Sequence, residues 1–207
     1  VPFSSWPHGG ETDFIDLINP KVSFDFLGGV FLSVFRKKNW TQNVNVLDEA
    51  AISDSHIFSH FDNTFPHVKI FAQAFANSRA FFHSKPLSIC LTGAREWASM
   101  YPLVRSVRLI EALSEYRKNG LSYFKYLQYK NYALSHFIPD FAYMFLHKKS
   151  SGFAYIRPLR LILRNFLYPN FYFSVVYFFL RKLRALIRKI FMVKSYSSRS
   201  DIVRQRL

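Results

Sequence analysis

The residues best suited to chemistry in this sequence of 207 residues are its seven histidines and its single cysteine. His56 and His60 are four residues apart, so on a helix they would share one face, a geometry that can bind a metal ion. No carboxylate partner is fixed by the spacing, and ordinary polar positions explain the pair equally well. Cys90 alone can form neither an internal disulfide nor a Cys/His zinc site. We therefore predict no metal site in this chain.

Common nucleotide-binding and hydrolytic motifs are missing from the sequence. It contains no GxGxxG, GxxxxGK[ST], GxSxG or HExxH pattern. Half of the residues are hydrophobic and 19% are aromatic, which excludes a disordered chain. The sequence is therefore expected to fold, but without the dinucleotide fingerprint, the P-loop or the serine-hydrolase elbow.

The positive charge is concentrated in the last quarter of the chain. Lys and Arg number 28 against 13 Asp and Glu, a formal net charge of +15. Residues 155–207 hold 12 of these basic side chains and one acid, Asp201, whereas residues 1–154 hold 16 basic and 12 acidic side chains. No carboxylate lies between Asp140 and Asp201. Such a surplus is matched by an acidic partner: nucleic acid, an anionic membrane or a phosphorylated substrate.

The elements that would position functional residues in the first half are short. Residues 22–35 form two aromatic and β-branched segments around Gly28 and Gly29, compatible with strand, glycine break and then strand or helix. Residues 46–58 have helical spacing, and residues 87–91 have the pattern of a short buried strand. Thr64 is the expected N-cap of a further helix, with Pro66 in its first turn.

From residue 100 onward the pattern is helical. An apolar stripe runs through Leu103, Val107, Ile110 and Leu113, and residues 119–120 (Asn-Gly) supply a stop. The polar side is expected to carry Arg105, Arg108, Glu111 and Glu115. Residues 123–137 continue similarly, and residues 153–169 form a basic and apolar segment. Residues 171–180 are apolar but too short to span a bilayer, which needs about 20 residues.

Residues 176–191 have the pattern of a cationic amphipathic helix of the kind that lies in a membrane interface. We call its apolar face the C-terminal stripe: Val176, Leu180, Leu183, Ile187 and Ile190. The membrane-binding candidates on or near the opposite face are called the C-terminal cations: Arg181, Arg184, Arg188 and Lys189.

Two segments carry a resemblance to a known family: Phe26-Leu27-Gly28-Gly29-Val30-Phe31-Leu32-Ser33-Val34-Phe35-Arg36-Lys37-Lys38-Asn39-Trp40 and, further on, Thr64-Phe65-Pro66-His67. Their order and spacing resemble the acceptor-side half of family 2 glycosyltransferases. The sequence is most similar to bacterial O-antigen enzymes such as abequosyltransferases, which transfer a sugar from a nucleotide donor to a lipid-linked oligosaccharide. The resemblance covers residues 20–95.

The resemblance implies an α/β fold class: a partial GT-A-like layer over residues 1–99, followed by a mainly helical, basic region over residues 100–207. In this family the donor-binding half carries an Asp-x-Asp metal site, and here the nearest imitation is Glu11-Thr12-Asp13. The implied cofactor, Mg²⁺ or Mn²⁺, and the nucleotide sugar therefore belong to the complete enzyme. The chain is expected to be its acceptor-side fragment, inactive when isolated.

The resemblance also implies site residues. Family members carry an acidic Glu-Asp pair downstream of the glycines, and one carboxylate deprotonates the acceptor hydroxyl. Asp62 and His67 occupy that window, and both residue types can abstract a proton. The alternative is that His67 packs or caps at a helix start and that Asp62 is a solvated turn residue.

The resemblance also implies a set of acceptor-binding residues. Gly28 and Gly29 would allow close approach of an acceptor sugar, or form a plain turn. Arg36 and Lys37 would meet the diphosphate of the lipid carrier or of the donor, or form a solvated basic turn. Trp40 would stack on a sugar face, or serve only in packing.

The sequence thus predicts a transferase of O-antigen or lipopolysaccharide biosynthesis, peripheral on the cytoplasmic face of the inner membrane. Its partners would be a nucleotide sugar, a polyprenyl-diphosphate-linked acceptor and an anionic membrane surface. The alternative is a nonenzymatic basic protein that binds a membrane or RNA, since interleaved aromatic and basic residues can stack bases. The wide apolar face of residues 176–191 disfavours nucleic acid as the partner.

Overall fold

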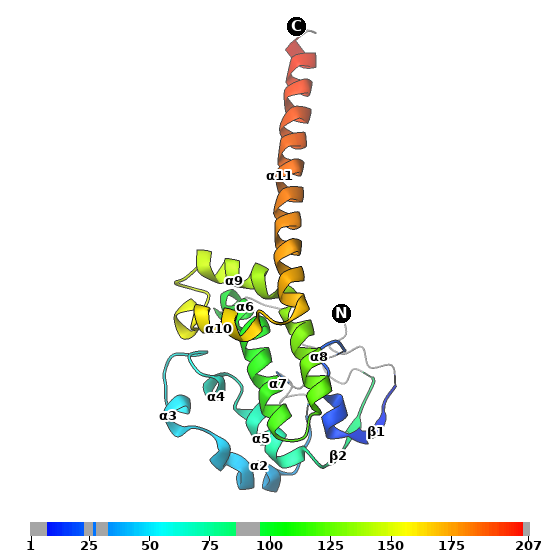
Figure 1. Cartoon of the computed structure of the whole chain (residues 1–207), viewed down its shortest axis with the longest axis vertical. Coiled ribbons are helices and arrows are strands. Elements are labelled where there is room, and N and C mark those ends of the chain that lie inside the picture. Colours follow the sequence, from blue (N-terminus) through cyan, green and yellow to red (C-terminus); the bar gives the residue numbers. More distant parts are fainter. Residues whose placement is uncertain (1–7, 23–26, 28–32, 86–95, 205–207) are drawn as a thin grey trace.

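A computed structural model describes residues 8–22, 27, 33–85 and 96–204, with the backbone alone for residues 96–97 and 189–204. Figure 1 shows a helical body from which one long helix projects. The strands and main helices are, in chain order, β1 (Gly10–Asp13), α2 (Lys37–Asn43), α3 (Glu49–Ile52), α4 (Phe61–Thr64), α5 (Pro66–Phe75), β2 (Arg79–Phe82), α6 (Tyr101–Leu103), α7 (Leu109–Lys118), α8 (Tyr123–Ala133), α9 (Phe137–Leu146), α10 (Pro158–Asn165) and α11 (Pro169–Arg204).

The fold is rich in helix, and the expected helical region over residues 100–207 is confirmed. In the described part of the chain, sheet structure is limited to one antiparallel pair, β1 and β2, with Glu11 opposite Phe81. The strands predicted within residues 22–35 and 87–91 lie largely or wholly outside the described residues. The described part of residues 1–99 is therefore a two-stranded ribbon with short helices.

One helix length and one N-cap differ from the sequence prediction. The helix expected over residues 46–58 is only the four-residue α3, capped by the side chain of Asp48. It ends early because the Asp54 carboxylate accepts bonds from the hydroxyl of Ser59 and the amide of His56, which fold the chain into a tight loop. Helix α5 begins as predicted at Pro66, but its N-cap is Phe65. The predicted cap, Thr64, instead donates its hydroxyl to the His60 carbonyl.

The core forms where α5, α7 and α8 pack together. Of the predicted stripe, Leu103, Val107 and Leu113 are buried there, and Ile110 is half-buried. Residues 104–108 form a π-helical turn between α6 and α7. Such a turn inserts an extra residue and rotates the side chains around the axis. Arg108, expected on the polar side, is buried at this turn and donates to the carbonyls of Phe58 and Ser59. Helix α7 ends at Lys118, as the Asn-Gly stop predicted.

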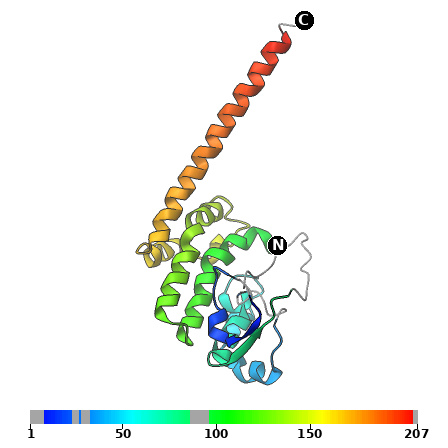
Figure 2. The same ribbon diagram turned by 90° about the vertical axis from the view of Figure 1, so that its right-hand side faces the viewer.

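The continuous helix expected over residues 123–137 is interrupted by a 3₁₀ turn at residues 134–136, after which α9 begins. Helix α11 is much longer than the amphipathic stretch predicted for it, and it rises from the body in both views (Figures 1 and 2). Its first turns are anchored by buried Phe171 and Ser174. Among the described helices, none has the length and apolar character required to cross a membrane.

Candidate functional site

Asp62, the first candidate base, is buried in an ion pair. Its Oδ2 accepts from the backbone amide of Asp48 at 2.8 Å and from Nζ of Lys69 at 2.7 Å. The alternative prediction of a solvated turn residue is therefore wrong. The carboxylate joins the start of α3 to α5, and this pairing offsets the cost of burying its charge.

His67, the second candidate base, is also buried, in the first turn of α5. Its Nε2 donates to the carbonyl of Leu27 at 3.0 Å, so the ring carries its lone pair on Nδ1. Burial lowers the pKa of His67 from 6.5 to about 4, against a smaller raising effect of the bond to Leu27. The imidazole is therefore neutral at pH 7.

Trp40 packs into an aromatic cluster with Phe35, Phe71 and Phe75. Its ring stacks on Phe35 at a centroid distance of 5.8 Å and meets the edge of Phe71 at 6.3 Å. Phe71 in turn contacts the ring of His67 at 5.8 Å. Trp40 therefore contributes to packing, and its half-buried ring remains partly accessible.

The remaining acceptor-side candidates lie at the start of α2 or outside the described residues. Arg36 and Lys37 are exposed where α2 begins. Gly28 and Gly29 fall outside the described part of the chain. Figure 1 places α2 at the end of the body opposite the start of α11. A ligand at Arg36 and Lys37 would therefore be far from a surface bound by α11.

The histidine pair considered for metal binding does not share a helix face. His56 and His60 lie in the loop between α3 and α4, where His56 Nδ1 is 2.8 Å and His60 Nε2 is 3.4 Å from the carboxylate of Asp54. Hydrogen bonds from the hydroxyl of Ser59 and from the backbone amide and ring of His56 lower the pKa of this partly exposed carboxyl. Within the residues that the structure describes, no three His, Cys, Asp or Glu side chains are arranged to hold a metal ion.

A buried polar centre, which the sequence did not indicate, joins α9 to the π-helical turn. The Asp140 carboxylate accepts from Nε of Arg105 at 3.0 Å and from its Nη2 at 2.5 Å, and also from the hydroxyl of Ser106. The Asp140 carboxylate raises the pKa of Arg105, although partial burial acts in the opposite direction. The partners are about 35 residues apart, so no local pattern could have linked them.

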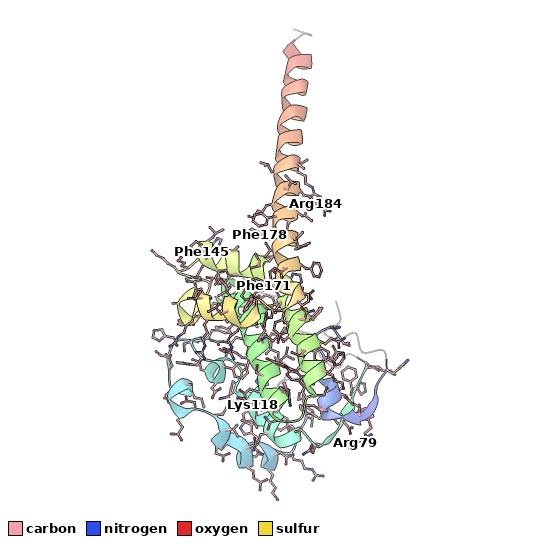
Figure 3. All side chains as sticks on the ribbon, in the orientation of Figure 1. Arg79, Lys118, Phe145, Phe171, Phe178 and Arg184 are labelled. Atoms are coloured by element: carbon pink, nitrogen blue, oxygen red, sulfur yellow. The ribbon has the colours of Figure 1, made fainter. Side chains whose placement is uncertain are left out.

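The C-terminal stripe is open to solvent at its described positions. Val176, Leu180, Leu183 and Ile187 are between 41% and 55% exposed. The buried residues Phe171 and Ser174 project from the other side of α11, so the stripe faces away from the body. Of the C-terminal cations, Arg181, Arg184 and Arg188 are exposed; the side chain of Lys189 lies outside the described residues. Figure 3 shows Arg184 on the projecting part of the helix, beyond the body.

Comparison of the chain with protein-family models, curated proteins and solved structures finds no match.

Proposed function

We propose that this chain is the acceptor-side part of a family 2 glycosyltransferase that works on a lipid-linked saccharide at an anionic membrane. The observation that carries the proposal is the hydrogen bond between His67 and Leu27. It joins the two segments that together resemble the family, although the bonded residues are 40 apart in sequence. Phe35 and Trp40 from the first segment pack on Phe71, one turn beyond His67.

In this proposal His67 acts as the base and Asp62 positions it. Nδ1 of His67 carries the lone pair that would accept the proton of the acceptor hydroxyl. A pKa of about 4 makes the resting ring a weak base. The negative charge of a donor diphosphate would raise that pKa and strengthen the base when both substrates are bound. Asp62, paired with Lys69, fixes α5 against α3.

The ribbon of β1 and β2 and the segments around it would be this chain's share of a GT-A-like α/β layer. The nucleotide sugar and its Mg²⁺ or Mn²⁺ would be held by the donor-binding half of that layer. Arg36 and Lys37 then suit the diphosphate of a nucleotide sugar better than that of a membrane-bound carrier, because α2 lies opposite α11. The cytoplasmic face of the inner membrane is the corresponding location.

Saturation-transfer NMR with a water-soluble O-antigen oligosaccharide tests the saccharide part of this proposal. We expect signal transfer to the sugar from the full chain, and an affinity about tenfold lower for Trp40→Phe, which keeps an aromatic ring but narrows the stacking surface. The matched control is Lys118→Gln, a charge removal on the exposed last turn of α7. If the oligosaccharide gives no transfer from any variant, the enzyme proposal is wrong.

A second candidate function is that of a nonenzymatic membrane-peripheral protein. The observation that favours it is that both Asp62 and His67 are buried and engaged in contacts within the protein. Under this alternative the two residues serve only in folding, and the chain binds vesicles without any response to the saccharide. The NMR experiment, which contains no lipid, separates the two candidates.

A further inference from the structure

Helix α10 has a second apolar side that is exposed. Leu161 and Ile162 pack against the body, and Asn165 is buried. On a different side, Leu159 is 70% and Leu163 is 60% exposed, and this side continues into Leu167, which is 79% exposed. Leucine side chains at i and i+4 form a stripe along a helix, so α10 is apolar toward both the body and the solvent.

Arginines border the exposed side of α10. Arg157, Arg160 and Arg164 are all exposed, and the sequence around them contains no carboxylate between Asp140 and Asp201. The end of α9 adds exposed Leu146 and the exposed lysines that follow it in the sequence. Phe145, also exposed, lies at this end of the molecule in Figure 3. Protruding leucines bordered by guanidinium groups match a bilayer surface, whose acyl region accepts the leucines and whose phosphates accept the arginines.

One surface can contact α10 and α11 together. Only residues 166–168 separate the two helices. Figure 2 shows α10 and the start of α11 at the same margin of the molecule, with the bulk of the body on the other side. The C-terminal stripe also faces away from the body, because Phe171 and Ser174 occupy the opposite side of α11.

We propose that α10 is a second membrane-contacting element, which docks together with α11 on anionic lipid and holds the α2 end of the body away from the bilayer. This inference deepens the membrane part of the proposed function and rests on it. Docking through two helices fixes an orientation, whereas α11 alone would leave the body to rotate about a single axis.

Site-specific fluorescence in vesicles tests the orientation. In a Cys90→Ser background, an environment-sensitive dye is attached through Leu163→Cys on α10 or through Lys118→Cys at the far end of the body. With vesicles of phosphatidylcholine and phosphatidylglycerol carrying brominated acyl chains, we expect quenching of the dye at position 163 and none at position 118. Vesicle binding without quenching at position 163 overturns the proposal, as does failure of the full chain to bind these vesicles.

Measurements of vesicle affinity test whether the arginines and leucines of α10 contact the lipid. Replacing the three α10 arginines by Gln should lower vesicle affinity by up to about 100-fold at low salt, and Leu159→Asp with Leu163→Asp should lower it at least about tenfold. Arg117→Gln with Lys118→Gln, which removes two exposed charges from α7, should change it little. Circular dichroism checks that each variant is folded. If the arginine changes reduce RNA retention but leave vesicle affinity unchanged, the surface binds RNA and the proposal is wrong. Because the saccharide experiment contains no lipid, its failure is distinguishable from failure here.

Discussion

Replacing His67 by Gln should remove a specific acid sensitivity of the fold. The native ring has a pKa of about 4, whereas the unfolded ring titrates near 6.5. Between these values the unfolded chain takes up a proton that the native chain does not, so stability falls as the pH falls. The difference between the two pKa values corresponds to about 3 kcal/mol in the free energy of unfolding. Of this stability, about 2 kcal/mol is lost between pH 7.5 and pH 5.

The assay is urea unfolding of both proteins, followed by circular dichroism, at several pH values between 4 and 7.5. The glutamine side chain of the variant would keep an N–H donor for the Leu27 carbonyl without titrating, so the difference between the two curves isolates the histidine. We expect the wild-type free energy of unfolding to fall more steeply with acid than that of the variant. Parallel curves would show that His67 is not buried in the neutral form, and the argument from Leu27 would fail with it.

Three further predictions concern packing and the membrane. Asp140→Ala should cost about 1–3 kcal/mol in urea unfolding, because it leaves the buried Ser106 hydroxyl and the half-buried Arg105 without their acceptor. Lys118→Ala on the surface should cost almost nothing, and equal effects of the two changes would contradict this prediction. Gly152→Ala should lower the melting temperature, since Gly152 has φ of +70° and an added Cβ would lie 2.7 Å from Leu103; an unchanged melting temperature would refute the close packing. In flotation assays, replacing the C-terminal cations by Gln should weaken binding to anionic vesicles by orders of magnitude. Replacing both Leu183 and Ile187 by Asp should abolish binding. Intact binding by the aspartate variant would show that the C-terminal stripe is packed on protein.

The sequence predicted local features well where one short-range rule determines the structure. Pro66 at a helix start, the Asn-Gly stop after α7 and the exposed C-terminal stripe each follow from a single rule of capping or periodicity. Helical periodicity did not predict the burial of Arg108, whose guanidinium is held in the core by the backbone carbonyls of Phe58 and Ser59. The pairs of Asp62 with Lys69 and of Asp140 with Arg105 depend on tertiary packing, which single-sequence patterns do not encode.

Equilibrium binding to two matched vesicle populations tests the central claim most directly. Both contain phosphatidylcholine and phosphatidylglycerol at equal surface charge; one carries a polyprenyl-diphosphate-linked O-antigen oligosaccharide and the other carries polyprenyl diphosphate without sugar. If the chain is the acceptor side of a transferase held at the membrane by α10 and α11, it should bind both populations and prefer the saccharide-bearing vesicles by about tenfold. Equal affinity for the two populations would contradict the transferase and leave a membrane-binding protein.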